Sequence, residues 1–293
     1  MSSALEQLAI LIPTRNRPGI LATTLQELKT AGLARVPLWV YDDCSTDPDA
    51  IRLVVREHWE QGTVLRGATR VGQAQGRNVL MKSCGRAYGL LIDDDSFPVS
   101  VASLVRHLTG PHPPDRAIIT SQYMDVPTRR FSTPLELGAG TARSFQGGGS
   151  LFHIPTVLAL GGFRSCFIYG YEEPELSLRV WLNGYRIWYD PTFVVHHNHF
   201  ETPSECRDYQ EYDYLYARNS ILMSSLNLPL WFGLPHGLAR SIRRSFFRKR
   251  NFSAKLRGTL TGIKMTFTLG AERRAATWQQ TSNWLKFNRQ CPR

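Results

Sequence analysis

The sequence predicts an α/β protein whose mostly parallel central sheet is flanked by helices, with a helical extension at the C-terminus. Two observations carry this prediction. Over the first half of the chain, short apolar runs typical of buried strands alternate with segments of helical periodicity, which indicates βαβ units. The 293 residues, 42% hydrophobic and 20% charged, are also enough for one large domain with an appendage.

The expected elements follow one another in a regular order. Apolar runs predict strands at 8–13, within 36–47, at 63–67, at the end of 72–95 and at 117–123. Helical spacing of apolar residues predicts helices around 21–28, at 51–59, at the start of 72–95 and at 101–108. The second half is predicted to contain a helix and a strand within 170–191, a strand tip at 192–199 and a helix from about 207.

Several protein classes are disfavoured by motifs that the sequence lacks. No apolar run reaches the ~18 residues of a membrane-spanning helix, and the N-terminus has no signal-peptide pattern, so we expect a cytoplasmic protein. The five scattered cysteines form no C-x-x-C pair, which argues against a zinc ribbon. No G-x-G-x-x-G follows the first strand and no G-x-x-x-x-G-K-[ST] occurs, which argues against a dinucleotide dehydrogenase and a P-loop NTPase.

Polar residues follow the first, second and fourth predicted strands at their carboxyl ends, where open parallel sheets bind ligands. These residues are Thr14 to Asn16, Asp42 with Asp43, and Asp93 to Asp95. A divalent cation held by the carboxylates would leave positions open for phosphate oxygens. On an extended backbone, Asp93 and Asp95 would face one side and Asp94 the other. A solvated turn that caps the next helix is the structural alternative.

Two further groups of ionisable residues could belong to the same site. Three acids begin the helix predicted within 170–191: Glu172, Glu173 and Glu175. Acids there either complement the helix dipole or supply a general base. Three histidines end the following strand: His196, His197 and His199. We interpret at least one of them as a metal ligand or a phosphate contact.

Nine short segments, in this order, resemble the family 2 glycosyltransferases with the GT-A fold, most closely bacterial rhamnosyltransferase-like enzymes of polysaccharide assembly. The resemblance covers roughly residues 8–225. Its segments are "ILIPTRNRP", "VYDDCSTD", "GQAQGRN", "LLIDDDSFP", "GGGSLFHI", "GGF", "YGYEEPELSLR", "VVHHNH" and "ARNSILMSSLNLP". The chain departs from the family at Cys44, where glycine is usual, and at Glu173, where aspartate is commoner.

The resemblance implies a site for a UDP-, dTDP- or GDP-linked sugar. The residues that it implies for donor binding are Pro13, Thr14, Arg15, Asp42, Arg77, Asp93 and Asp94. Among them, Asp42 would accept a hydrogen bond from the base, and Arg77 or its neighbour Asn78 would contact the donor. Asp94 would contact a ribose or sugar hydroxyl.

The resemblance also implies a divalent metal, Mn²⁺ or Mg²⁺, and an inverting transfer to the hydroxyl of a glycan or a lipid-linked acceptor. Asp95 and His196 are the implied metal ligands, with His197 as the alternative to His196. Glu173 is the implied catalytic base, with Glu172 as the alternative.

The positive charge of the chain is concentrated near its C-terminus. Eight Arg and Lys side chains lie between Arg240 and Arg257 with no acid among them, within a net charge of +11 for the whole chain. Together with interleaved apolar residues, they predict one basic amphipathic helix at 238–258. This helix either docks peripherally on an anionic membrane surface, at the inner face of the membrane, or packs its apolar stripe on the catalytic domain.

We expect a glycosyltransferase domain at 1–225 and a basic helical extension at 226–293. Two other classes are weaker alternatives. A nucleic-acid-binding protein would use the same basic helix but would leave the acid clusters unexplained, so no nucleic acid is expected. A sugar-nucleotide pyrophosphorylase-like nucleotidyltransferase needs a glycine-rich loop after the first strand, and "IPTRNRP" has no glycine.

Overall fold

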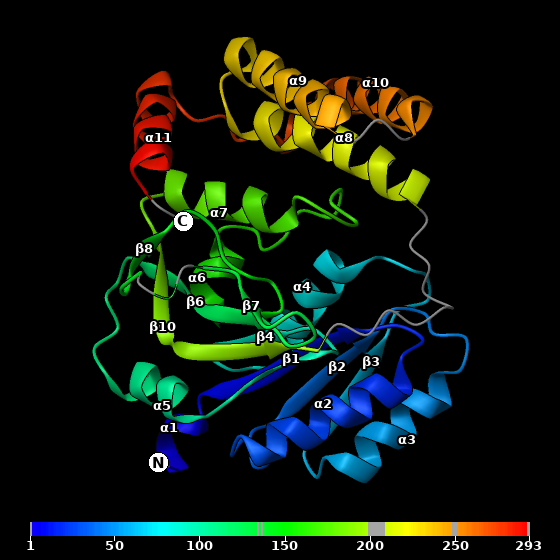
Figure 1. The fold of residues 1–293 in the computed structure, drawn as a ribbon, viewed down its shortest axis with the longest axis vertical. Helices are drawn as coiled ribbons and strands as arrows, with labels where there is room; N and C mark the ends of the chain where they lie inside the picture. Colours follow the sequence, from blue (N-terminus) through cyan, green and yellow to red (C-terminus); the bar gives the residue numbers. More distant parts are fainter. Residues whose placement is uncertain (1, 134, 136, 199–208, 248–250, 292–293) are drawn as a thin grey trace.

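A central sheet of ten strands runs through the molecule (Figure 1). The computed structural model describes residues 2–133, 135, 137–198, 209–247 and 251–291. The strands are β1 (Leu8–Thr14), β2 (Leu38–Asp42), β3 (Gly62–Arg66), β4 (Tyr88–Ile92), β5 (Ser96–Pro98), β6 (Arg116–Asp125), β7 (Arg130–Phe131), β8 (Gly140–Ala142), β9 (Gly149–His153) and β10 (Arg186–His197). Their main order is β3-β2-β1-β4-β9-β6-β10-β5.

The pairing of the strands determines which loops meet. β3, β2, β1 and β4 are parallel neighbours, so their carboxyl ends lie at one edge. β9 is antiparallel to β4, and its register pairs Gly149 with Ile92. β5 is antiparallel to β10 and pairs Ser96 with His197. Because of these two pairings, the glycine loop before β9 and the end of β10 both lie beside Asp93–Asp95.

Helices cover both faces of the sheet, as predicted for an α/β protein. They are α1 (Ser2–Leu5), α2 (Pro18–Thr30), α3 (Pro48–His58), α4 (Gln73–Ser83), α5 (Ala102–Thr109), α6 (Ile154–Ala159) and α7 (Glu172–Leu182). All residues of β1 are buried, and they alternate between two cores. Ile10 packs in the core with α2, α3 and α5, whereas Leu11 packs in the core with α4, α6 and α7.

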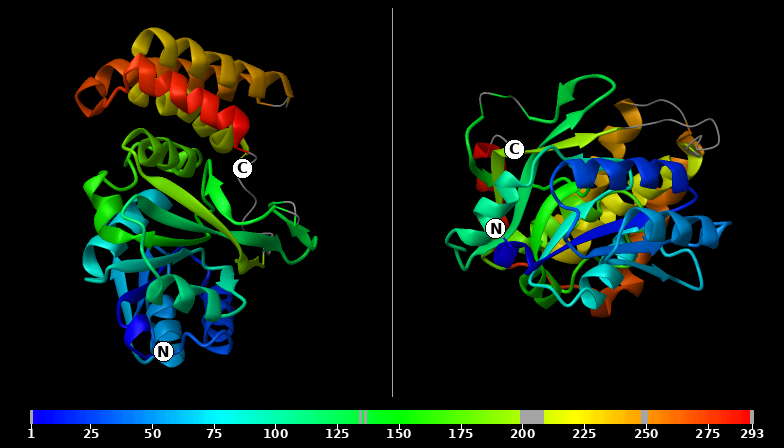
Figure 2. Two further views of the ribbon diagram at one scale, coloured as in Figure 1. Left: turned by 90° about the vertical axis from the view of Figure 1, so that its left-hand side faces the viewer. Right: turned by 90° about the horizontal axis from the view of Figure 1, so that it is seen from below.

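The C-terminal helices form a further layer over α7 (Figures 1 and 2). They are α8 (Tyr209–Asn227), α9 (Leu230–Phe247), α10 (Phe252–Thr268) and α11 (Trp278–Gln290), with a 3₁₀ turn, η2, at Gly270–Glu272. A third apolar core joins Leu178 of α7 to Leu222 of α8 and Trp284 of α11. No helix in the described part of the chain is both long and apolar enough to cross a membrane.

The prediction of one helix over 238–258 is wrong. α9 ends at Phe247 and α10 begins at Phe252, after Asn251, which has a left-handed backbone with φ of 55°. Residues 248–250, and His199 of the predicted histidine group, lie outside the described residues. The basic run is therefore divided between two helices, which do not share one continuous apolar stripe.

Candidate active site

The carboxyl ends of β1 and β4 meet through a buried hydrogen bond. The Thr14 hydroxyl, at the end of β1, donates to Oδ2 of Asp94 over 2.6 Å. The guanidinium of Arg17, at the start of α2, lies against two carboxylates. Its Nη1 is 2.6 Å from Asp94 Oδ1, and its Nη2 is 2.9 Å from Asp95 Oδ2. Arg15, the arginine singled out in the sequence, is exposed instead.

The three consecutive aspartates do not alternate on an extended backbone, so this prediction is wrong. Asp94 and Asp95 form a turn between β4 and β5. They therefore share Arg17, whereas Asp93 turns towards α4 and accepts a 2.7 Å hydrogen bond from Arg77 Nη2. Two arginines of the chain itself are thus positive partners of the triplet.

The two aspartates that share Arg17 differ in their electrostatics. Burial raises the pKa of Asp94 to about 7, against the lowering effect of Arg17, and the charge of Asp95 adds to the increase. Burial also acts to raise the pKa of Asp95, but the hydrogen bond and charge of His197, together with Arg17, outweigh it and lower that pKa. Asp95 is therefore the more readily ionised of the two.

The end of β10 brings His197, and not His196, to the aspartates. His197 Nε2 lies 3.3 Å from Asp95 Oδ1, and the carboxylate raises the pKa of this imidazole against the effect of burial. His196 points to the other side of the strand, where its ring packs edge-on against Phe97 with centroids 5.8 Å apart.

Asp95 and His197 supply part of the ligand set that a divalent metal ion needs. In the described part of the chain, no three His, Cys, Asp or Glu side chains form a group that could hold a metal ion. However, Mg²⁺-type sites commonly use one or two carboxylates and complete their shell with substrate phosphates and water. The 3.3 Å between Asp95 Oδ1 and His197 Nε2 is close to the separation of adjacent donors on an octahedral ion with bonds of about 2.2 Å. Asp95 and His197 therefore suit an ion that arrives with a phosphate ligand.

The positive charge of Arg77 acts both on Asp93 and on the acids of α7. Its side chain is buried on α4 and lies over the Phe163 ring, with Cζ 5.7 Å from the ring centroid. It donates to Asp93, while its Nε and Nη1 are buried without a hydrogen-bond partner among the described residues. The neighbouring Asn78 instead bonds the backbone of Phe163 through both its Oδ1 and Nδ2. Arg77 thus faces the site, and Asn78 holds the loop beside it.

Glu172 and Glu173 begin α7 after Tyr171, whose backbone is left-handed with φ of 70°. Glu173 Oε1 accepts a 2.6 Å hydrogen bond from the Gly147 N–H. Burial, and then the charge of Glu172, raises the pKa of Glu173 to about 8, against the lowering effect of Arg77. Burial likewise raises the pKa of Glu172, whose Oε2 has no hydrogen-bond partner in the described structure. Two neighbouring buried carboxyl groups therefore have too little positive charge around them to keep their pKa values at the ordinary level.

The glycine loop before β9 leaves the space that these side chains occupy. A Cβ on Gly147 would collide with Glu173 Oε1, and one on Gly148 would lie 2.6 Å from Asp93 Oδ2. The loop backbone therefore passes directly beside both acids, which an alanine at either position would displace.

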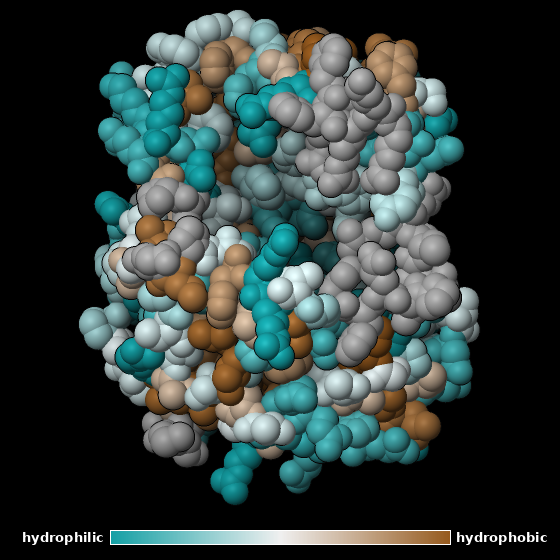
Figure 3. All heavy atoms as spheres, viewed as in Figure 1, coloured by the Kyte–Doolittle hydropathy of each residue, from teal (hydrophilic) through white to brown (hydrophobic). Residues whose placement is uncertain are grey.

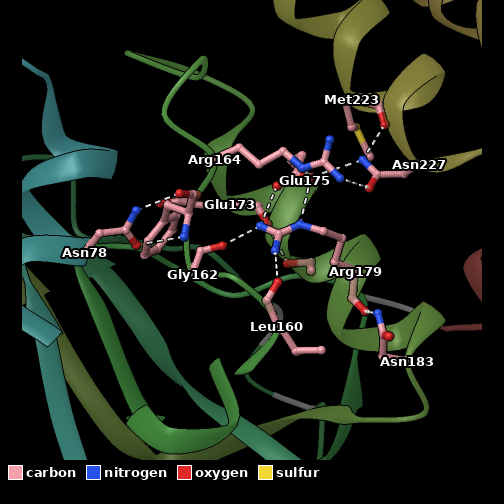
Figure 4. A network of polar contacts seen from close by, with 12 residues as sticks. Asn78, Leu160, Gly162, Arg164, Glu173, Glu175, Arg179, Asn183, Met223 and Asn227 are labelled. Carbon is pink, nitrogen blue, oxygen red and sulfur yellow. Dashed lines mark hydrogen bonds and ion pairs between the residues drawn. The ribbon is translucent and has the colours of Figure 1, made fainter. Parts of the chain in front are cut away.

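The third acid of α7, Glu175, belongs to a separate polar network (Figure 4). It is fully buried and forms ion pairs with Arg179 at 2.8 Å and Arg164 at 3.0 Å. Asn227, at the end of α8, donates to its Oε1 over 3.1 Å. Burial raises its pKa, but Arg179 and Arg164 more than offset burial and lower it. This network joins α7 to the C-terminal layer.

The remaining predicted residues lie at the ends of β1 and β2. Pro13 is buried opposite Tyr41 in the parallel pairing. Asp42 is buried and accepts hydrogen bonds from the Ser45 N–H and from Arg66. The structure thus brings together Thr14, Asp42, Arg77, Asp93–Asp95, Glu172 and Glu173 at one edge, and adds Arg17 and His197.

Comparison with known proteins places the fold. Residues 9–156 match the family described as "Glycosyl transferase family 2". No curated protein sequence matches the chain. Many solved structures match the chain, and the three named below are less than 25% identical to it in sequence.

Three of these structures illustrate the likeness. A mannosyltransferase, PcManGT, from Pyrobaculum calidifontis in complex with GDP-Man and Mn²⁺ has a TM-score of 0.58 and 17% identity, over 97% of this chain and 79% of its own. S. aureus TarS, residues 1–349 with UDP-GlcNAc, has a TM-score of 0.58 and 18% identity, over 89% and 80%. GalNAc-T7 with UDP, GalNAc and Mn²⁺ has a TM-score of 0.65 and 12% identity, over 98% and 58%. The fold of this chain is the GT-A fold that such neighbours share.

Proposed function

The chain belongs to glycosyl transferase family 2, and we propose that it is an inverting, metal-dependent enzyme. It would move a sugar from a nucleotide-diphosphate donor to an acceptor hydroxyl. The observation that carries this proposal is the position of Glu173. This carboxyl group, with a pKa raised to about 8, lies in one site with Asp93, and the positive charge of Arg77, which donates to Asp93, acts on both acids.

The edge formed by β1, β2 and β4 is the proposed donor site. Neighbouring structures are complexes with GDP-Man, UDP-GlcNAc and UDP, which supports a nucleotide-sugar donor here. In this proposal the nucleoside is bound by Pro13, Thr14, Arg15 and Asp42. The sugar hydroxyls of the donor are bound by Asp93 and Asp94. Arg77, whose unsatisfied N–H groups lie beside Asp93, would donate to the transferred sugar or to the diphosphate.

Asp95 and His197 are the proposed metal ligands, so His197 replaces His196 in this role. Two of the neighbours contain Mn²⁺, and Asp95, whose pKa is lowered by His197 and Arg17 against the effect of burial, lies 3.3 Å from His197. When bound, Mn²⁺ or Mg²⁺ supplies positive charge that neutralises the donor diphosphate. Arg17, which contacts Asp94 and Asp95 through two nitrogens, would have to give up part of this contact as the ion binds.

Glu173 is the proposed general base, and Glu172 raises its pKa. The Glu173 carboxylate would take the proton of the acceptor hydroxyl, whose oxygen forms a bond to the anomeric carbon. The bond from that carbon to the diphosphate oxygen breaks, and the leaving nucleoside diphosphate keeps the electron pair. Attack from the opposite face inverts the anomeric configuration.

We further propose that residues 1–225 form the catalytic unit and 226–293 an extension to it. The product would be a polysaccharide or another glycoconjugate.

A panel of nucleotide sugars tests the proposal. We expect one UDP-, dTDP- or GDP-sugar to raise the unfolding temperature more with Mn²⁺ than without it, and transfer from that donor to release the nucleoside diphosphate. The Mn²⁺-dependent part of the shift should be lost in His197→Ala and kept in the matched variant His196→Ala. Release of pyrophosphate from a nucleoside triphosphate and a sugar phosphate would instead identify a nucleotidyltransferase and contradict the proposal.

A further inference from the structure

Helix α10 turns its smallest residues inwards. The residues that it buries against α8 include Ala254, Gly258, Gly262 and Thr266, spaced four apart on one face. A Cβ on Gly258 would collide with the Tyr214 carbonyl oxygen, and one on Gly262 would lie 2.8 Å from the Arg218 carbonyl oxygen. The two helices therefore pack backbone against backbone, and large side chains have no room between them.

The same helix turns large apolar residues outwards. The outer α10 face, as we call it, consists of Phe252, Leu256, Leu260 and Phe267, which are 69%, 48%, 58% and 62% exposed. A helix on the surface of a water-soluble protein ordinarily buries such residues and exposes polar ones. In Figure 3, hydrophobic residues accordingly reach the upper edge of the molecule, where Figure 1 shows α9 and α10. This face has the polarity of a helix that contacts an apolar medium on its outer side.

Helix α9 is built in a similar way. It packs Gly233 and Gly237 on the backbone of α8, and it exposes Trp231 (65%) and Ile242 (50%). The apolar exposure thus extends over two consecutive helices of the C-terminal layer and is not limited to a single residue.

The stretch of chain that forms this surface contributes cations and no acids, and Asp213, the acid beside Asn251 at the start of α10, is buried. Residues 214–271 contain ten Arg and Lys residues and no Asp or Glu. On α10, Arg257 and Lys264 are exposed and lie next to the apolar row in the helical spacing. A partner of this surface must therefore accept large apolar side chains and carry negative charge.

An anionic lipid surface meets both requirements, because acyl chains accept the apolar row and headgroups attract the cations. A nucleic acid meets only the electrostatic requirement. A second copy of the same face meets only the apolar requirement, since it would bring like charges together.

We propose that the outer α10 face docks the protein on an anionic lipid surface, with α10 lying in the plane of the interface. The sequence places the membrane contact at 238–258. The structure moves the proposed contact to 252–267, which lies on α10 and not on α9. None of these residues belongs to the proposed catalytic site, so this inference does not depend on the proposed function.

Sedimentation of the full chain with vesicles tests the proposal. We expect the protein to pellet with vesicles of equal parts phosphatidylcholine and phosphatidylglycerol, and not with phosphatidylcholine alone. The double variant Leu256→Gln/Leu260→Gln should weaken this partition about tenfold or more. Arg257→Gln/Lys264→Gln should weaken it about tenfold, and salt should have a similar effect.

Matched controls lie outside the C-terminal layer, on α2 and α3 and just after β5. Leu53→Gln/Val99→Gln replaces two apolar residues of similar exposure, and Lys29→Gln/Arg56→Gln removes two exposed cations. Both control variants should partition as the unchanged protein does. If Leu256→Gln/Leu260→Gln unfolds at a lower temperature than Leu53→Gln/Val99→Gln, its weaker partition could result from lost stability. The partition of Arg257→Gln/Lys264→Gln then tests the proposal.

Three results would overturn the proposal. The first is that the unchanged protein pellets with neither kind of vesicle at low salt. The second is that a control pair weakens the partition as much as the corresponding α10 pair does. The third is that the protein forms a dimer or binds duplex DNA without vesicles, and loses this binding in the α10 variants, which would assign the face to that partner.

Discussion

Glu173 and Glu175 lie two residues apart on α7 and have opposite electrostatic surroundings. Glu175 is enclosed by Arg164, Arg179 and Asn227, and its pKa is lowered. Glu173 has Glu172 beside it and Arg77 as its main compensating charge, and its pKa is raised to about 8. The same residue type on the same helix is thus fixed as an ion in one place and kept ready to exchange a proton in the other.

We propose that Glu173 serves chemistry and Glu175 stability, and the substitution Glu173→Gln tests the first assignment. We expect transfer to fall by about 10³-fold, because general-base catalysis typically contributes 10²- to 10⁴-fold. Thermal stability and the donor-induced shift should remain, since the amide can still accept the hydrogen bond from Gly147. Turnover close to that of the unchanged enzyme would remove Glu173 as the base and direct attention to Glu172.

Glu175→Ala tests the second assignment. Removal of this carboxylate leaves the partly or fully buried cations of Arg164 and Arg179 without their shared partner, and we expect the free energy of unfolding to fall by about 3–5 kcal/mol. Chemical denaturation measures this change. Glu57→Ala, an exposed acid on α3, should change stability by no more than about 0.5 kcal/mol. Comparable stabilities of the two variants would contradict the structural role of the network.

The pH dependence of activity and of stability is the third test of this contrast, and its expected effects are the smallest. The basic form of Glu173 is fully present only above its pKa of about 8, so kcat/KM should fall by up to about tenfold for each pH unit below that value. The stability that Glu175 supplies is also lost on acidification, but at a lower pH. Its lowered pKa gives stability that is present above the unfolded value of 4.5 and is lost as the pH falls below it. A transfer rate that is flat from about pH 6 to pH 9 would contradict the first part.

The α/β fold and the edge of the sheet that carries the site could be predicted because they depend on local patterns. Apolar runs that end in acids mark the carboxyl ends of strands, and the predicted GT-A fold is confirmed. The antiparallel insertion of β9 between β4 and β6 could not be read from local apolar patterns, because it depends on pairing between distant residues.

The partners of the site residues could not be predicted for a similar reason. "TRNRP" contains two arginines, and only the turn after β1 decides that Arg17 reaches the aspartates. Adjacent histidines face opposite sides of β10, and the pairing with β5 places His197 beside Asp95. Glu175 looks like an acid that complements the helix dipole until Asn227, 52 residues later, is seen to bind it.

The 52 residues between Glu175 and Asn227 have a consequence for the order in which the protein folds during synthesis. A ribosome releases the chain from its N-terminus, so β1 to β4 and the aspartates emerge well before α8. Until Asn227 emerges, Glu175 lacks one of its three partners and α7 lacks the cover of the C-terminal layer. The nascent protein therefore completes the strands of the proposed donor side first, and the helix that carries the proposed base is secured only after residue 227 has been synthesised.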